Sequence, residues 1–116
     1  AFYSPFNNCQ IGLEYLYGNR RNYNDVAALE IADGSNVRDN GGNNSQFSSG
    51  TMTLTVLPGA TVKIHGYPGY TSYSVNGGAE ITDEYYTITV AEGGQVVITP
   101  VNSNNYFYSI EVTTTK

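Results

Sequence analysis

The feature that most restricts the fold of this chain is the alternation of apolar and polar residues with a period of two. In TMTLTVL, residues 51–57, Met52, Leu54 and Val56 would face one side of an extended strand and the threonines the other. The same alternation recurs in CQIGLEYLY (9–17), TVKIHGY (61–67), YYTITV (85–90), GGQVVITP (93–100) and YFYSIEV (106–112). Because strands with one buried face have this period, the sequence predicts at least six strands.

Strong turn residues separate the predicted strands. They are Pro58-Gly59, Pro68-Gly69, Asn76-Gly77-Gly78 and Gly93-Gly94. Asn-Gly tolerates the positive φ angles of a tight hairpin, and Pro-Gly favours a turn. We interpret residues 65–75 as a hairpin that turns at Pro68-Gly69. Short strands at intervals of about ten residues indicate an all-β fold, a single antiparallel β-sandwich that is jelly-roll-like, with residues 1–116 as one domain.

Two segments leave alternatives open. NDVAALEIADG, residues 24–34, fits a strand or a short helix, and we interpret it as a strand. DGSNVRDNGGNNSQFSSG, residues 33–50, has no apolar pattern. Loops of this length are uncommon inside compact domains, so the segment is either a surface loop or in part a broken, polar edge strand.

Charge and composition argue against several classes of function. Ten acidic residues stand against five basic ones, a net charge of -5, whereas general nucleic-acid binding needs the opposite balance. No apolar run approaches the ~20 residues that span a membrane. Cys9 is the only cysteine, so the chain has no internal disulfide and no cysteine-based zinc site. Few lysines and many Tyr, Asn and Thr residues lead us to expect a secreted or cell-surface protein.

Catalysis has weak support in the sequence. The only histidine, His65, falls on the outward face of its predicted strand, and no nucleophile motif accompanies it. A Cys9–His65 pair, the neighbours Asp83-Glu84, or Asp25 with Glu30 are the remaining candidates. A small sandwich leaves little room for a cleft between two catalytic acids. We therefore expect no enzymatic activity and no catalytic residue.

Calcium is the one metal that the composition allows. Residues 33–44 are rich in Asp and Asn oxygens, with Asp33 and Asp39 as the carboxylate candidates. The segment does not match an EF-hand, since Arg38 stands at the sixth position where that loop requires glycine. Asx turns explain the same composition. The sequence thus predicts no cofactor and leaves calcium open.

Tyrosine is the strongest functional signal, with eleven tyrosines and no tryptophan. A tyrosine ring packs against the apolar face of a sugar, and neighbouring polar side chains bind the hydroxyls. Tyrosines in loops or at turns are the ones expected at the surface. The resulting candidates for ligand binding are Tyr67, Tyr70 and Tyr23, with Arg20, Arg21 and Lys63 as polar partners.

The strand alternation assigns most other tyrosines to the core. Those in register with inward aliphatic residues are Tyr15, Tyr17, Tyr86, Tyr106 and Tyr108. Tyr73 falls on the face opposite Tyr70, so we predict that it packs inside.

Residues 38–112 resemble a known family. A threonine-rich strand leads into PGATVKIHGY, and YSVNGG, YYTITVAEGG and the closing YFYSIEV follow in that order. These segments resemble the small β-sandwich carbohydrate-binding modules appended to secreted bacterial enzymes that degrade plant polysaccharides, particularly pectinolytic ones. The resemblance implies a non-catalytic module that binds a plant cell-wall polysaccharide and targets an attached catalytic domain to it.

The chain departs from that family in two respects. Such modules often present a tryptophan platform, which this chain lacks. Pectin binders use lysine-rich patches, whereas the residues that could serve here are only Lys63, Arg20, Arg21 and Arg38. We expect a monomer that binds polysaccharide, and neither nucleic acid nor membrane. The alternative is a structural or adhesive β-sandwich of a bacterial surface protein without a glycan ligand.

Overall fold

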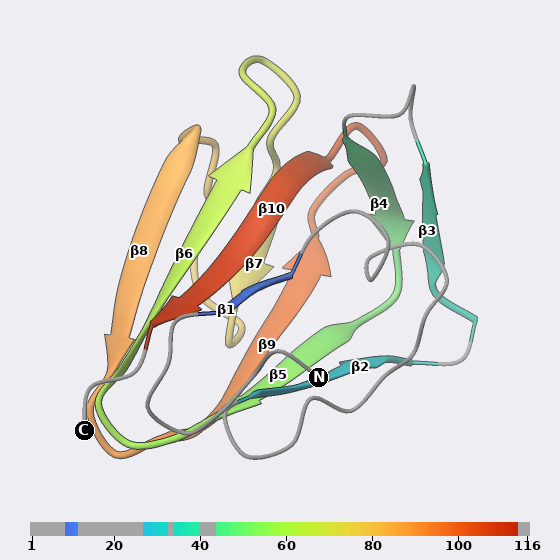
Figure 1. The fold of residues 1–116 in the computed structure, drawn as a ribbon. Helices are drawn as coiled ribbons and strands as arrows, with labels where there is room; N and C mark the ends of the chain where they lie inside the picture. The colour runs from blue at the N-terminus through green and yellow to red at the C-terminus, as the bar shows by residue number, and fades with distance from the viewer. Residues whose placement is uncertain (1–8, 12–26, 33, 40–43, 114–116) are drawn as a thin grey trace.

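The protein folds as two antiparallel sheets packed face to face (Figure 1). The computed structural model describes residues 9–11, 27–32, 34–39 and 44–113, and the regular elements in these ranges are all strands. The six-stranded sheet has the order β3-β4-β10-β6-β8, with β1 also paired to β10, and the four-stranded sheet has the order β2-β5-β9-β7. The predicted all-β antiparallel sandwich is confirmed.

The strands of the six-stranded sheet are β1 (Cys9–Ile11), β3 (Asn36–Asp39), β4 (Ser45–Ser49), β6 (Ala60–Gly66), β8 (Tyr85–Val90) and β10 (Tyr106–Thr113). Those of the four-stranded sheet are β2 (Ala27–Ile31), β5 (Met52–Val56), β7 (Tyr73–Val75) and β9 (Gly94–Pro100). None of the described residues forms a helix long and apolar enough to cross a membrane.

The core lies between the sheets and follows the predicted alternation. In β5, Met52, Leu54 and Val56 are buried while the threonines between them are partly or fully exposed. β6 buries Val62 and Ile64 in the same way. Full burial of one such side chain stabilises the fold by roughly 1.5–3 kcal/mol, so the inner faces hold the two sheets together.

From β4 onward, the connections pass between the sheets rather than between neighbouring strands. From β4 to β10 every successive strand lies in the opposite sheet, a jelly-roll-like path. The turn at Pro68-Gly69 is present, with Gly69 at φ 85°, but it joins β6 to β7 in the other sheet. The hairpin interpretation of residues 65–75 is therefore wrong. Turn residues set the local reversal, whereas burial of each apolar face decides which strands pair.

The Asn76-Gly77 turn is a tight reversal of the predicted kind. Asn76 and Gly77 have φ angles of 52° and 74°, and the Gly78 amide donates to the Val75 carbonyl at 3.0 Å. Positive φ at both central positions is the geometry that favours Asn-Gly. The turn returns the chain so that Ile81 forms an isolated bridge with Tyr73.

Both ambiguous segments contain strands. Residues 27–31 form β2, as interpreted, and residues 36–49 include β3 and β4. β3 is the polar edge strand, so the second alternative for residues 33–50 is correct. β4 lies inside the sheet because it pairs with β10 as well, and it contributes the fully buried Phe47 to the core.

A β-bulge in β10 overturns part of the core prediction. Phe107 pairs with Gly66 and Ser109 with His65, so Tyr108 is an extra residue without a partner on β6. The bulge reverses the parity of the strand, and Phe107, Ile110 and Val112 are the buried residues.

The prediction that Tyr106 and Tyr108 pack in the core is wrong, because both are only half-buried and contact rings on the outer face. Tyr86 does pack against the core, as predicted, with its ring centroid 6.4 Å from that of Tyr73. Tyr73 itself is fully buried, as predicted. Tyr15 and Tyr17 lie outside the described residues.

Candidate functional site

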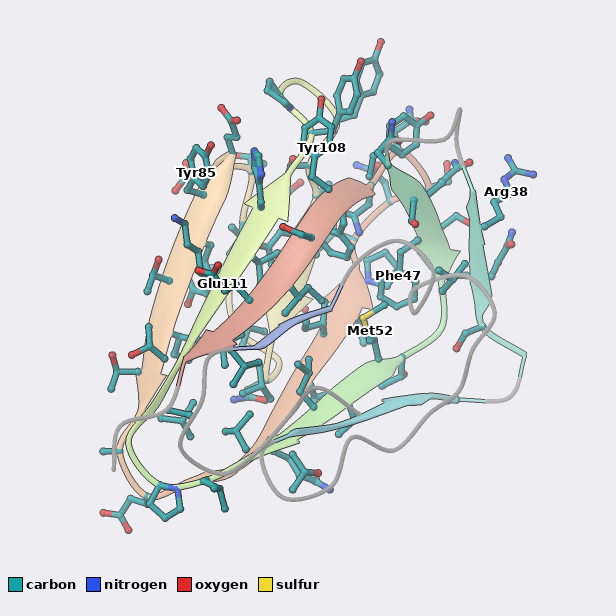
Figure 2. All side chains as sticks on the ribbon, in the orientation of Figure 1. Arg38, Phe47, Met52, Tyr85, Tyr108 and Glu111 are labelled. Carbon is teal, nitrogen blue, oxygen red and sulfur yellow. The ribbon has the colours of Figure 1, made fainter. Side chains whose placement is uncertain are left out.

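Aromatic rings from several strands meet on the outer face of the six-stranded sheet. They come from the start of β8, the end of β6, the first half of β10 and the turn that follows β6. We call this set the outer row, and it consists of Tyr85, His65, Tyr108, Tyr67, Tyr106 and Tyr70. Figure 2 shows Tyr85 and Tyr108 at the same end of the sheet, with Glu111 further along β10.

Ring contacts run without a break from β8 through β6 to β10. Tyr85 stacks on His65 with centroids 4.3 Å apart and planes 16° apart, because the two residues are paired across β8 and β6. His65 lies 4.7 Å from Tyr108 at a 45° tilt. Tyr108 in turn stacks on Tyr67 at 5.3 Å and 20°. The bulge residue thus connects the ring at the end of β6 to the rings of the turn.

The row ends at the turn after β6. Tyr70 stacks on Tyr106 at 5.3 Å and 17°. Both rings meet Tyr67 edge-on, at 5.8 Å for Tyr70 and 5.9 Å for Tyr106. Tyr67 and Tyr70 are therefore inclined by 66° and do not form one flat platform.

Exposure is concentrated at the two ends of the outer row. Tyr85 is 53% exposed and Tyr70 is 47% exposed, while the rings between them are half-buried. The intermediate rings stack on or tilt against one another, which covers part of their faces. Open ring surface for stacking is therefore greatest at Tyr85 and at Tyr70.

A small open pocket adjoins the Tyr85 end. It has a volume of about 200 Å³ and is lined by Lys63, His65, Tyr85, Ser109 and Glu111. Cross-strand pairing assembles it, because His65 pairs with Ser109 and Lys63 with Glu111. The Lys63 ammonium lies 5.1 Å from the centroid of the Tyr85 ring, within range of a cation–π contact. The pocket thus places an aromatic ring beside hydroxyl, ammonium and carboxylate groups.

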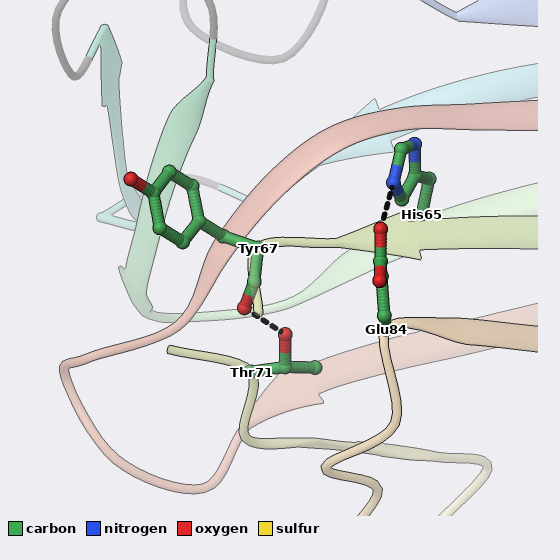
Figure 3. Close-up of polar contacts among 4 residues, drawn as sticks. All are labelled: His65, Tyr67, Thr71 and Glu84. Atoms are coloured by element: carbon green, nitrogen blue, oxygen red, sulfur yellow. Dashed lines mark hydrogen bonds and ion pairs between the residues drawn. The ribbon is translucent and has the colours of Figure 1, made fainter. Parts of the chain in front are cut away.

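Glu84 fixes the orientation of His65. Its Oε2 lies 2.9 Å from Nε2 of His65 (Figure 3), and the Glu84 carbonyl accepts the Gly66 amide at 2.7 Å. The imidazole is held between Tyr85 and Tyr108 by these contacts. Among the described residues no hydrogen bond joins Ser109 to His65, whose Nε2 is in contact with Glu84 instead.

Backbone contacts hold the turn of residues 67–70 against β10. The Tyr67 amide donates to the Tyr106 carbonyl at 3.0 Å, and the Tyr106 amide donates to the Tyr70 carbonyl at 2.8 Å. Thr71 Oγ1 donates to the Tyr67 carbonyl at 2.7 Å (Figure 3). A Cβ at Gly66 would lie 2.4 Å from this Oγ1, so the close approach requires glycine. The two tyrosines of the turn are fixed relative to the sheet.

The buried side-chain amide of Asn105 supports the end of the outer row at the turn of residues 67–70. Asn105 is fully buried, and its Oδ1 accepts the Ser72 amide at 3.0 Å while its Nδ2 donates to the Phe47 carbonyl at 3.3 Å. The Phe47 amide donates to the Asn105 carbonyl at 2.8 Å. A buried group with several partners is costly to disturb. Asn105 therefore links β4, the segment after the turn and the start of β10.

The structure brings together only some of the residues predicted for binding. Tyr67, Tyr70 and Lys63 lie on the outer face of the six-stranded sheet. The other candidates, Tyr23, Arg20 and Arg21, lie outside the described residues.

For calcium, Asp33 lies outside the described residues, and the backbone of Asp39 pairs with Ser45 in the edge strand. The described part of the chain contains no group of three or more His, Cys, Asp or Glu residues that could hold a metal ion.

The sequence prediction missed Tyr85, Tyr108 and Glu111. Tyr85 had a signal, since the alternation that directs Tyr86 inward directs Tyr85 outward. Glu111 also faces outward once Ile110 and Val112 are known to be buried. Tyr108 had no such signal, because its position depends on a bulge that the alternation does not reveal.

Comparison with known proteins identifies the fold. No protein-family model matches the chain, and no curated protein matches it. A solved structure from work on the Ruminococcus flavefaciens cellulosome and its expansion in glycan recognition aligns with a TM-score of 0.54 at 12% identity. The alignment covers 94% of this chain and 95% of the other. At this identity the likeness establishes that the two chains share a fold.

Proposed function

We propose that the protein is a non-catalytic carbohydrate-binding module that recognises a plant cell-wall polysaccharide and targets an attached enzyme to it. The observation that carries this proposal is the outer row, with open ring surface at Tyr85 and Tyr70 and the polar pocket beside Tyr85. A surface of rings adjoining hydroxyl, ammonium and carboxylate groups matches the mixed chemistry of a sugar, which has C–H faces and hydroxyls.

Binding would use the two ends of the row in different ways. At Tyr85 a sugar ring would stack on the aromatic face while Lys63, Ser109 and Glu111 contact its hydroxyls. At Tyr70 the ring offers a stacking surface supported by Tyr106. The pocket is smaller than the roughly 300–1,000 Å³ of drug-sized sites, so we expect contact with one sugar unit there and modest affinity.

The fold supports the same proposal. The sandwich is shared with a solved structure from work on cellulosomal glycan recognition. By the same likeness we propose a secreted, bacterial setting and fusion to a catalytic domain. We propose that the module has no activity of its own, because His65 is engaged by Glu84 and sandwiched between two rings.

Affinity electrophoresis tests the proposal. The wild type, Tyr85→Ala and Tyr70→Ala would be run in gels containing xylan, mixed-linkage glucan, xyloglucan, galactan or pectin, each with and without a calcium chelator. We expect at least one polysaccharide to retard the wild type, less retardation of both variants, and no effect of chelator. Thr55→Ala, exposed on the four-stranded sheet, is the matched control and should migrate like the wild type.

The outcomes separate the candidate functions. If no polysaccharide retards the wild type, the carbohydrate proposal is wrong and the structural or adhesive alternative gains support. If retardation occurs but survives both tyrosine substitutions, the module binds glycans at another place. If chelator abolishes retardation, calcium takes part in binding.

A further inference from the structure

The charges that surround the pocket are predominantly negative. Lys63 and Glu111 are paired across β6 and β10, and Glu84 reaches the adjoining His65. Among the described residues that line or adjoin the pocket, one lysine therefore faces two carboxylates. Residues paired across strands lie within the screening length of about 8 Å at physiological ionic strength, so each carboxylate acts on the whole pocket.

The single lysine is also already engaged. Its ammonium lies over the Tyr85 ring at 5.1 Å, and Glu111 is its cross-strand neighbour. A sugar carboxylate that approached Lys63 would have to compete with the Tyr85 ring. It would also approach Glu111, and like charges this close repel each other. The described pocket lacks the surplus of positive charge that recognition of a polyuronate requires.

The same carboxylate suits a neutral sugar. Ionised Glu111 can only accept hydrogen bonds, and sugar hydroxyls donate them. Hydrogen bonds of this O–H···O⁻ type are short and about twice as strong as neutral ones. Ser109 on β10 and Lys63 on β6 supply the complementary hydrogen-bond donors of the pocket. Glu111, Ser109 and Lys63 therefore each have a role with a neutral sugar.

We propose that the ligand of this site is a neutral polysaccharide, not a uronic-acid polymer, with Glu111 as the residue that accepts its hydroxyls. This inference rests on the proposed carbohydrate function and names the class of glycan. It differs from the pectinolytic association implied by the sequence resemblance.

A matched pair of substitutions tests the inference. Glu111→Gln and Lys63→Gln each replace a charge with the same neutral amide at facing positions of β10 and β6. For a neutral glycan, we expect Glu111→Gln to weaken binding about tenfold, because a charge-assisted acceptor is lost, and Lys63→Gln to weaken it less. Raising the salt concentration should leave wild-type binding nearly unchanged. The probes are xylan, galactan and mixed-linkage glucan against polygalacturonate, measured by calorimetry.

Each outcome decides one point. Binding to a neutral polysaccharide but not to polygalacturonate, with the larger loss in Glu111→Gln, supports the inference. Salt-sensitive binding to polygalacturonate that Lys63→Gln abolishes overturns it and leaves the carbohydrate function in place. Equal losses in the two variants would remove Glu111 as the acceptor. Failure of the wild type to bind any of these probes, or any polysaccharide of the electrophoresis panel, overturns the proposed function itself, and thermal unfolding of each variant checks that the fold is retained.

Discussion

Phe107 and Tyr108 are neighbours in the chain but belong to two aromatic clusters with opposite properties. Phe107 lies in the inner cluster, which we define as Phe47, Phe107 and Tyr73, all fully buried (Figure 2 labels Phe47). Tyr108 lies in the outer row and is half-buried. In the inner cluster the rings meet at 40° and 71°, whereas Tyr108 stacks on Tyr67 at 20°.

The difference follows from what each cluster must fill. Inner rings come from both sheets and fill a three-dimensional space, so tilted and edge-to-face contacts pack best. The Tyr85–His65 pair of the outer row comes from adjacent strands of one sheet, whose spacing of about 4.8 Å favours parallel rings. The inner cluster therefore stabilises the fold, and the outer row forms a surface. Substitutions in the two clusters should separate stability from binding.

The largest expected effect is that of Phe107→Ala. Removing a fully buried ring should lower the free energy of unfolding by about 3–5 kcal/mol, because burial is lost and a cavity remains. Urea denaturation followed by circular dichroism measures the change. Phe107→Leu, which refills most of the space, should cost less than half as much. A loss below about 1 kcal/mol for Phe107→Ala would contradict the assignment of this ring to the core.

Gly66→Ala should have the next largest effect because it disturbs the close contact between Gly66 on β6 and Thr71 after the turn. The new Cβ would lie 2.4 Å from Thr71 Oγ1, so overpacking should cost about 1–3 kcal/mol of unfolding free energy. In a Thr71→Ala background the clash is relieved, and the same substitution should cost less. Strict additivity of the two changes in a double-mutant cycle would show that they do not interact.

Tyr108→Ala should reverse the pattern of Phe107→Ala. The ring is half-buried, so the free energy of unfolding should fall by only about 1 kcal/mol, mostly from lost ring–ring contacts. Under the proposed function, glycan binding should weaken about tenfold as the row is interrupted. Tyr108→Phe keeps the ring and should keep stability. Urea denaturation and affinity electrophoresis on the same samples give both values, and a loss of stability comparable to that of Phe107→Ala would contradict the comparison.

Tyr73→Phe should have the smallest effect, and it should raise the free energy of unfolding where the other substitutions lower it. The Tyr73 hydroxyl is buried without a hydrogen-bond partner among the described residues, so its removal should raise the free energy of unfolding by about 1 kcal/mol. Urea denaturation at neutral pH measures this change. Ser45→Ala removes another buried hydroxyl without a partner. It is the matched control for the measurements at alkaline pH.

Tyr73 should also make the stability of the protein depend on pH in the alkaline range. Burial raises the pKa of Tyr73 above its ordinary value, and Tyr86 and Asp83 raise it further. Above about pH 10 the unfolded chain releases this proton while the folded chain keeps it, so the wild type should lose stability as the pH rises. Tyr73→Phe should lose less over that interval, and Ser45→Ala should behave like the wild type. Equal alkaline losses in all three proteins would exclude Tyr73 as the cause.

The sequence predicted the fold class well because alternation reports burial directly. Met52, Leu54 and Val56 are buried as expected, and so is Tyr73. The turns at Pro68-Gly69 and Asn76-Gly77 also lie where their residues predict. Which strands pair was harder to predict from the sequence. A turn of a given geometry can connect two strands of the same sheet or two strands that lie in different sheets. The burial of both inner faces, a property of the whole chain, decides between them.

The candidate site was predictable only in part, for a physical reason that differs between residues. Lys63 and Tyr85 follow from alternation, since each flanks inward residues. Tyr67 and Tyr70 follow from their position at a Pro-Gly turn. The stacking of Tyr108 on Tyr67 depends on a one-residue shift of register, and no local pattern encodes it. The inward prediction for Tyr106 and Tyr108 failed for this reason.

The bulge in β10 can be regarded as a single inserted residue. A chain without Tyr108 would still alternate correctly, with Phe107, Ile110 and Val112 toward the core and Ser109 and Glu111 outward. Folding of the inner face therefore does not need the insertion. What the insertion adds is one outward side chain opposite His65, so that a ring and a hydroxyl both occupy a place where a regular strand offers one. Length variation at this point would change the outer row while leaving the core intact, and under the proposed function it would alter specificity.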